Sequence, residues 1–284
     1  MNTWKFIAER FPFKATLPLT AILALGPMSG APFTIADGAV IFTTLFLTLL
    51  ALRMADDLAS IDTDRITHPD RGLPSGRIDA AGLTYAMATV ATMAVVLNLS
   101  RGHFRSLLFL AGVYTLYFLF FRKIPVLIKP FLSNLVFGWI PPYVAATLLN
   151  RFSFEHLMLG LFAYGSAIAH EYAHSVHAAD EASGRLKTYA SLLGPRRSAI
   201  LSLLMYVAAG TMGLVYWSHA GRPVFFLLIL MVTTIRIIYL EIRLIDDPGV
   251  RTARPFYIAG FGFFLFPYSG LIFDNLVFSK VSLW

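Results

Sequence analysis

The sequence contains no cysteine among its 284 residues. Disulfide bonds, thiolate nucleophiles and cysteine-ligated zinc or iron–sulfur centres are therefore excluded. Charged residues are also scarce, at 14% of the chain, and no polar run is long enough to form a separate domain. A typical soluble domain carries about 25% charged residues, so this composition argues against a soluble protein. We predict instead that residues 1–284 form a single membrane domain.

Hydrophobic residues are abundant, at 57% of the chain, and the mean hydropathy is +0.68. They form runs of roughly the 20 residues that a helix needs to cross a bilayer. Because a helix satisfies its own backbone hydrogen bonds in lipid, we predict an all-α polytopic membrane protein with about nine transmembrane helices around a central cavity. The predicted spans are residues 15–33, 39–57, 80–98, 106–121, 128–148, 157–177, 197–217, 223–245 and 256–276.

Positive charge is distributed unevenly among the connections between these spans. One set of connections carries most of the bases, and the other carries only Arg101, Arg105, Arg151, Arg222 and Lys280. The positive-inside rule places the basic connections and the N-terminus in the cytoplasm, and an odd number of spans places the C-terminus outside. The net charge of +7 suits loops that face anionic lipid. Because the bases are dispersed, we expect no nucleic-acid binding.

The polar stretch of residues 53–78 follows the second predicted span, on the cytoplasmic side. Asp56, Ser60 and Asp64 recur every four residues, so they share one face if the helix continues, and Asp57 lies beside that face. Carboxylates this close repel one another unless a cation lies between them. Mg²⁺ suits this position because it takes one or two carboxylates and fills its shell with water and phosphate oxygens. The alternative is a solvated acidic loop that balances nearby arginines.

The same stretch reads Asp56-Asp57-x-x-Ser60-x-x-x-Asp64 and then His68-Pro69-Asp70-Arg71-x-x-Pro74-Ser75-Gly76. It resembles the first signature of the UbiA superfamily of intramembrane prenyltransferases. Two positions depart from that signature, because Ser60 replaces the usual Asp and Gly72 replaces the usual Pro. The resemblance implies a single prenyltransferase domain that binds Mg²⁺ through Asp56, Asp57 and Asp64.

A basic segment follows the fourth predicted span and resembles the family's segment after its fourth helix. The resemblance implies diphosphate binding by Tyr117, Arg122, Lys123, Lys129 and Asn134. Cationic side chains here can also be expected, on physical grounds, to grip a diphosphate and stabilise it as a leaving group. An amide within the membrane, such as Asn134, needs a polar partner. The alternative for Arg122 and Lys123 is that they only set the topology.

The polar stretch of residues 170–197, after the sixth predicted span, contains the pattern H-E-x-x-H at His170, Glu171 and His174. On a helix this spacing can bind zinc, with the glutamate as general base. His177 adds a third imidazole, and residues 246–247 offer a distant acidic ligand. An intramembrane zinc metalloprotease is therefore an alternative function of another class. It leaves the first acidic stretch unexplained.

This second stretch also resembles the family's second signature. Counting back from Thr188 and Gly194 places the two expected aspartates at His177 and Glu181. The resemblance implies a second metal position and a further phosphate ligand, namely Asp180 and Glu181 for the metal and Lys187 for the phosphate.

The resemblance implies transfer of a prenyl group from a polyprenyl diphosphate to an acceptor that is aromatic or otherwise soluble in lipid. The implied catalytic residues are Asp57, Lys129 and Glu181, and Arg71 joins the bases that offset the diphosphate charge. Two further hypotheses stay open. One is a terpene cyclase of the same superfamily, which needs no acceptor, and the other is a non-catalytic isoprenoid-binding relative. We expect the diphosphate, the acceptor and membrane lipid as partners.

Two charged residues lie deep in the eighth predicted span, Arg236 and Glu241. We expect them to pair with each other, or Arg236 to reach into the central cavity.

Overall fold

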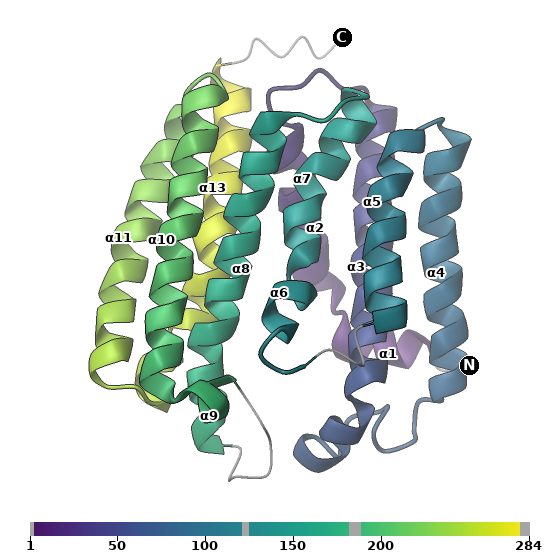
Figure 1. The fold of residues 1–284 in the computed structure, drawn as a ribbon. Helices are drawn as coiled ribbons and strands as arrows, with labels where there is room; N and C mark the ends of the chain where they lie inside the picture. The colour runs from purple at the N-terminus through teal and green to yellow at the C-terminus, as the bar shows by residue number, and fades with distance from the viewer. Residues whose placement is uncertain (1–2, 121–124, 182–188, 279–284) are drawn as a thin grey trace. The chain divides into compact units, whose positions relative to one another are not determined.

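The computed structural model describes residues 3–120, 125–181 and 189–278, with the side chains of residues 120 and 177–181 left out. The residues that it describes form helices and connections, with no strand among them (Figure 1). An all-α fold was predicted, and it is confirmed. The chain divides into two compact units. Unit 1 comprises Met1–Ala24, Phe33–Ile124 and Ala146–Arg151, and unit 2 comprises Leu25–Pro32, Pro125–Ala145 and Phe152–Trp284.

Unit 1 contains the helices of the N-terminal half of the chain. They are α1 (Thr3–Arg10), most of α2 (Phe13–Met28), α3 (Ile35–Thr67), α4 (Ala80–Ser100), α5 (Phe104–Thr115) and the π-helix η1 (Leu116–Phe120). The start of α3 is stabilised by a capping box, in which the side chains of Thr34 and Asp37 each accept a bond from the other's backbone N–H. Asp79 caps α4 in a similar way, by accepting from two backbone N–H groups of its first turn.

Polar side chains join the helices of unit 1 within its apolar interior. The amide of Asn98 on α4 donates to Thr44 Oγ1 on α3 at 2.8 Å and accepts from Ser106 Oγ on α5 at 3.1 Å. Closer to the middle of α3, Thr48 and Tyr114 share a buried hydrogen bond of 2.9 Å. Such bonds hold helices together where lipid supplies no competing partner.

Unit 2 contains the remaining helices. They are α6 (Lys129–Ser133), most of α7 (Leu135–Leu148), α8 (Phe154–Glu181), α9 (Tyr189–Leu193), α10 (Pro195–His219), α11 (Val224–Asp246), α12 (Val250–Ala253) and α13 (Phe256–Phe278). Here α8 packs along α10, and α11 packs along α13 (Figure 1). The carboxylate of Asp274 on α13 accepts from the backbone N–H groups of Phe225 and Phe226, both at 2.9 Å, and so caps α11 from a neighbouring helix.

Six helices among the described residues are long and apolar enough to cross a membrane, or seven if the bent pair α1 and α2 counts as one span. The predicted count of about nine is not confirmed. One reason is that the apolar helix Phe104–Leu119, formed by α5 and most of η1, is shorter than the roughly 20 residues that cross the hydrocarbon core. The helix α8, on which the predicted span 157–177 falls, is not among the six either. Another is that the first predicted span falls on α2, which is bent by 73° from α1.

Candidate diphosphate site

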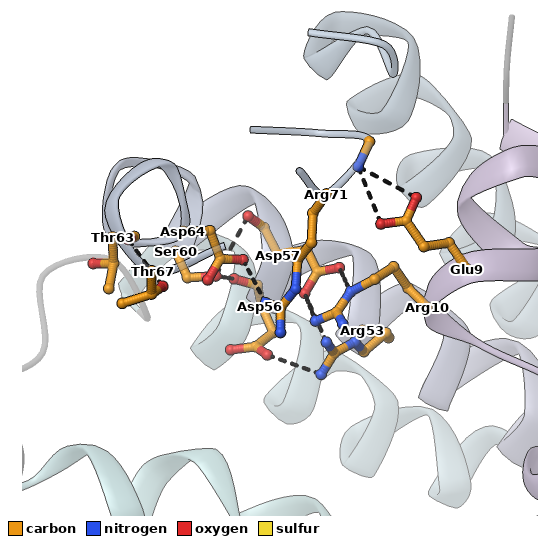
Figure 2. A network of polar contacts seen from close by, with 11 residues as sticks. Glu9, Arg10, Arg53, Asp56, Asp57, Ser60, Thr63, Asp64, Thr67 and Arg71 are labelled. Atoms are coloured by element: carbon orange, nitrogen blue, oxygen red, sulfur yellow. Dashed lines mark hydrogen bonds and ion pairs between the residues drawn. The ribbon is translucent and has the colours of Figure 1, made fainter. Parts of the chain in front are cut away.

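The C-terminal half of α3 carries the first acidic stretch. The helix continues to Thr67, so Asp56, Ser60 and Asp64 do share one face, as the spacing predicted (Figure 2). Short α1 lies next to this part of α3, because Phe6 and Phe11 pack into one apolar cluster with Met54 of α3 and Leu83 of α4. That packing places the charged end of α1 beside the acids.

Asp57 is the most buried of the acids, with 4% of its surface exposed. Arg10 at the end of α1 donates to both of its oxygens, from Nε to Oδ2 at 2.7 Å and from a terminal nitrogen to Oδ1 at 3.0 Å (Figure 2). Arg53, one turn earlier on α3, also lies 2.9 Å from Oδ1. A two-pronged guanidinium–carboxylate contact is among the stronger polar interactions in proteins. Asp57 therefore anchors α1 to α3.

The other two acids are each paired with an arginine as well. Asp56 Oδ2 lies 3.3 Å from Arg53, and the Asp56 side chain is 38% exposed. Asp64 Oδ2 lies 3.0 Å from Arg71, which comes from the loop after α3. Because three arginines face three aspartates, the mutual repulsion that the sequence indicated is balanced within the chain itself.

Ser60 has its hydroxyl turned to the backbone of its own helix. Its Oγ donates to the carbonyl of Asp56 at 2.8 Å, a bond common for serine within helices. The position at which the family usually carries a third carboxylate therefore presents a hydroxyl committed to α3.

The loop after α3 is held to the N-terminal segment by Glu9. Both oxygens of its carboxylate accept from the backbone N–H of Gly72, at 3.0 and 3.2 Å (Figure 2). Proline has no N–H to donate. The second departure from the family signature, glycine in place of proline, thus coincides with a bond that proline could not make.

Two residues of this network were missed at the sequence level, Arg10 and Glu9. Arg53 had a detectable signal, because it precedes Asp57 by four residues on one helix. No comparable signal marks Arg10 or Glu9, whose partners lie 47 and 63 residues away.

Tyr117 of η1 is buried and lines a cavity of about 370 Å³ within unit 1. The rest of the lining comes mainly from apolar residues of α3 and α4, including Leu58, Ile61 and Met87. None of the predicted acidic ligands lines this cavity. Tyr117 therefore contacts an apolar space next to α3, and its predicted role in binding diphosphate stays a prediction.

In unit 2 the described predicted diphosphate ligands lie at the two ends of α6, Lys129 at its start and Asn134 just after its last residue. Lys129 is its first residue and is partly buried. Asn134 is buried, and its amide donates to the carbonyl of Pro130 at 2.8 Å, which gives it the polar partner that was expected. Several other predicted site residues lie outside what the structure describes. They are Arg122, Lys123 and Lys187, and the side chains of His177, Asp180 and Glu181.

The H-E-x-x-H residues lie on α8, where the rings of His170 and His174 are 5.7 Å apart between centroids. His170 is buried against Phe261, with ring centroids 4.4 Å apart, and His174 contacts the ring of Tyr257. The hydroxyl of Tyr189 donates to Glu171 at 3.4 Å. Both imidazoles are thus packed against aromatic rings, and the zinc protease alternative is not favoured.

The acids of α3 fit Mg²⁺ as one or two carboxylate ligands. In the part of the chain that the structure describes, no three His, Asp or Glu side chains are grouped so that they could hold a metal ion. Asp56 and Asp64 are separated by about 12 Å along the helix axis. The described residues would therefore offer an ion one or two carboxylates, and Mg²⁺ is commonly held that way when phosphate oxygens and water complete its shell.

The deep charges of α11 do not pair with each other. Glu241 is fully buried and accepts from Ser202 Oγ of α10 at 2.6 Å. Arg236 instead lines a cavity together with residues of α8, α12 and α13. The predicted Arg236–Glu241 pair is wrong, because packing against α10 gives Glu241 a different partner.

Comparison with known protein families gives a match over most of the chain. The model of the UbiA prenyltransferase family matches residues 15–266. No curated protein sequence matches the chain.

Solved structures with a similar fold exist. A structure of a digeranylgeranylglyceryl phosphate synthase in membranes has a TM-score of 0.74 at 18% identity, over 96% of this chain and 99% of that one. A UbiA homologue from Aeropyrum pernix K1 has a TM-score of 0.74 at 16% identity, over 92% and 98%. One from Archaeoglobus fulgidus has a TM-score of 0.59 at 13% identity, over 94% and 99%. At these identities the likeness establishes the fold.

Proposed function

The chain belongs to the UbiA prenyltransferase family, and we propose that it transfers a prenyl group from a polyprenyl diphosphate to a lipid-soluble acceptor. Members of this family are prenyltransferases, and the chain is an integral membrane protein of the same fold. The observation that carries the proposal is the charged end of α3, where acids in two helical turns are matched by arginines from three segments. A site of this kind can hold both a cation and a phosphate.

The metal in the proposal is Mg²⁺, since enzymes of this family generally use a divalent ion to bind diphosphate. Of the three acids on α3, namely Asp56, Asp57 and Asp64, one or two at a time would hold it. Asp180 and Glu181 would hold a second ion. When bound, the ion neutralises diphosphate charge and so favours departure of the leaving group. Asp56 and Asp64 are the more open acids of the first set, whereas Asp57 contributes chiefly by fixing Arg10 and Arg53 in place.

The basic residues of the proposal stabilise the diphosphate as it leaves. Arg71 exchanges the Asp64 carboxylate for a phosphate oxygen, and the other contacts come from Tyr117, Arg122, Lys123, Lys129, Asn134 and Lys187. The allylic C–O bond breaks and its electron pair leaves with the diphosphate. The acceptor then forms a bond to the allylic carbon and loses a proton. Positioned cations in a site from which water is excluded favour this charge separation.

The test is prenyl transfer by the purified protein with a panel of diphosphates of different chain length. Because one structural neighbour is named as a digeranylgeranylglyceryl phosphate synthase, the acceptor panel includes a prenylated glyceryl phosphate as well as aromatic acids. We expect Asp64→Asn, Asp57→Ala and chelation of divalent ions each to lower the rate by about 100-fold or more. Product formed without any acceptor would instead indicate a cyclase.

A matched control is available on the same helix. Asp62 has a 78% exposed side chain and pairs with the exposed Arg65 at 3.0 Å, so Asp62→Asn should leave the rate unchanged. Full activity of Asp57→Ala, or full activity without a divalent ion, would refute the mechanism. Thermal unfolding of each variant separates a lost site from a lost fold.

A further inference from the structure

Unit 2 contains a cavity of about 630 Å³ that is rich in positive charge. It lies where α12 and the first turn of α13 meet α8 and α11. Three arginines line it, Arg236 of α11, Arg251 of α12 and Arg254 after α12, together with His174 of α8. The other lining residues are uncharged, and no carboxylate is among them.

These three arginines differ from those near the acids of unit 1. Arg10, Arg53, Arg65 and Arg71 each pair with an aspartate at 3.3 Å or less. Within the described chain, Arg236, Arg251 and Arg254 have no ion pair. Guanidinium groups that line one cavity repel one another, so an anion placed between them would lower the free energy of the folded protein.

The surroundings of the cavity indicate where the anion comes from. Arg236 lies ten residues before the end of the candidate span α11, or about 15 Å along the helix. Its neighbour Ile235 is 68% exposed, and Val232 and Tyr239 are exposed as well, as expected for a surface that faces lipid. A charged group at such a position is costly unless its long side chain reaches the level of the lipid headgroups.

The rim of the cavity on α13 has the features of a membrane interface. Tyr257 is 67% exposed and Ile258 is also exposed, although both line the cavity. Tyrosine is enriched where hydrocarbon meets headgroups, because its ring is apolar and its hydroxyl is polar. The arginines therefore share one space with apolar surface that acyl chains can cover.

We propose that this cavity binds the phosphate of an anionic phospholipid from the surrounding membrane. Arg251 and Arg254 bind the phosphate oxygens, for which the planar guanidinium fork is well suited. Arg236 reaches the same phosphate from deeper in α11, and the acyl chains lie along the exposed apolar face beside Ile235. This site is additional to the proposed transferase site and takes no part in prenyl transfer.

The experiment is native mass spectrometry of the delipidated protein with dioleoylphosphatidylglycerol or dioleoylphosphatidylcholine at equal concentration. We expect a clear preference for phosphatidylglycerol. Because each arginine near a membrane surface contributes about fivefold to the binding of anionic lipid, Arg251→Gln/Arg254→Gln should weaken it by about 25-fold. Arg236→Gln alone should weaken it by about fivefold. The matched control is Arg196→Gln/Arg197→Gln, which removes two exposed arginines from the first turn of α10.

Three results would overturn the proposal. The first is equal binding of the two lipids. The second is an equal loss in the test and control variants, which would show a general effect of net charge. The third is binding of inorganic phosphate or pyrophosphate that depends on Arg251 and Arg254 while phosphatidylglycerol binding does not, which would identify a site for a soluble anion. Size-exclusion profiles and the single variant Arg236→Gln guard against loss of folding, and no outcome depends on prenyl transfer.

Discussion

Asp57 shows how the acidic stretch is tolerated next to a membrane span. Its buried carboxylate pairs with Arg10 of α1 and with Arg53 of its own helix. Asp56 also pairs with Arg53, and Asp64 pairs with Arg71 of the following loop. The negative charge of the stretch is therefore neutralised within unit 1. The alternative interpretation of this stretch, acids that balance nearby arginines, thus describes the contacts in the protein without bound ligands. It is compatible with the proposed site, because an arginine that pairs with a carboxylate can also bind a phosphate oxygen.

The Arg10–Asp57 contact predicts a large loss of stability when it is broken. Removing one partner of a buried ion pair costs about 3 kcal/mol, because the other charge stays buried without compensation. We therefore expect Arg10→Gln to lower the free energy of unfolding by about 3 kcal/mol, measured by equilibrium unfolding in detergent micelles. Arg65→Gln breaks an exposed arginine–aspartate pair of similar length and should cost less than about 1 kcal/mol. Equal losses in the two variants would contradict the structural role of Asp57.

Ser60 predicts how the site would respond to a restored carboxylate. Ser60→Asp places a third acid between Asp56 and Asp64 at helical spacing, where like charges cost about 0.2–0.5 kcal/mol each. Without a divalent ion we expect a small decrease in thermal stability, and with MgCl₂ a larger stabilisation than in the natural protein. Thermal unfolding with and without MgCl₂ measures both effects, and Ser60→Asn serves as the uncharged control. A metal response identical to that of Ser60→Asn would argue against an ion on this face.

At the level of elements, the length of α3 matters most. Its 33 residues span about 50 Å, well beyond the hydrocarbon core of about 30 Å. We infer that the apolar first part crosses the bilayer and that the last turns extend past it with the acids. The high cost of carboxylates in lipid is avoided because the helix carries them out of the hydrocarbon.

The loop after α3 depends on the bond between Glu9 and Gly72. Gly72→Pro removes the N–H donor and places a Cβ 2.6 Å from Ile78 Cδ1 and 2.8 Å from Glu9 Oε2. The lost bond and this crowding together should lower the free energy of unfolding by about 3 kcal/mol or more. A double-mutant cycle identifies the cause. Glu9→Ala should be costly in the natural protein and neutral or stabilising in Gly72→Pro, because the shared bond is already absent and the crowding of Glu9 is relieved. Strictly additive losses would show that the two residues are not coupled.

For the whole molecule, the orientation in the membrane follows from the distribution of charge along the chain. We propose that the loops of both polar stretches face the cytoplasm and that the C-terminus lies outside. The absence of cysteine makes this easy to test, because any single cysteine that is introduced is the only thiol.

Two exposed arginines provide the test positions, Arg65 after the acids of α3 and Arg151 in the connection after α7. We expect a membrane-impermeant maleimide to label Arg151→Cys in intact cells and Arg65→Cys only after the membrane is permeabilised. The natural, cysteine-free protein is the control for background labelling. Labelling of Arg65→Cys in intact cells would contradict the proposed orientation.

The amino-acid sequence by itself was sufficient for the all-α membrane fold, the family and the shared face of Asp56, Ser60 and Asp64. Each of these depends on local information, namely the length of apolar runs, the helical repeat and the order of residues in a motif. The number of spans was less predictable, because it depends on where a helix bends, as between α1 and α2, or ends early, as α5 does.

Which charged groups meet depends on how the helices pack. Asp57 contacts Arg10 from 47 residues away, Glu9 binds Gly72 from 63 residues away, and Glu241 pairs with Ser202 while Arg236 joins Arg251 and Arg254. Nothing in the local sequence favours these partners over others of the same type. The choice depends on which helix faces pack together, and that is set by the shapes of apolar side chains distributed over the whole chain.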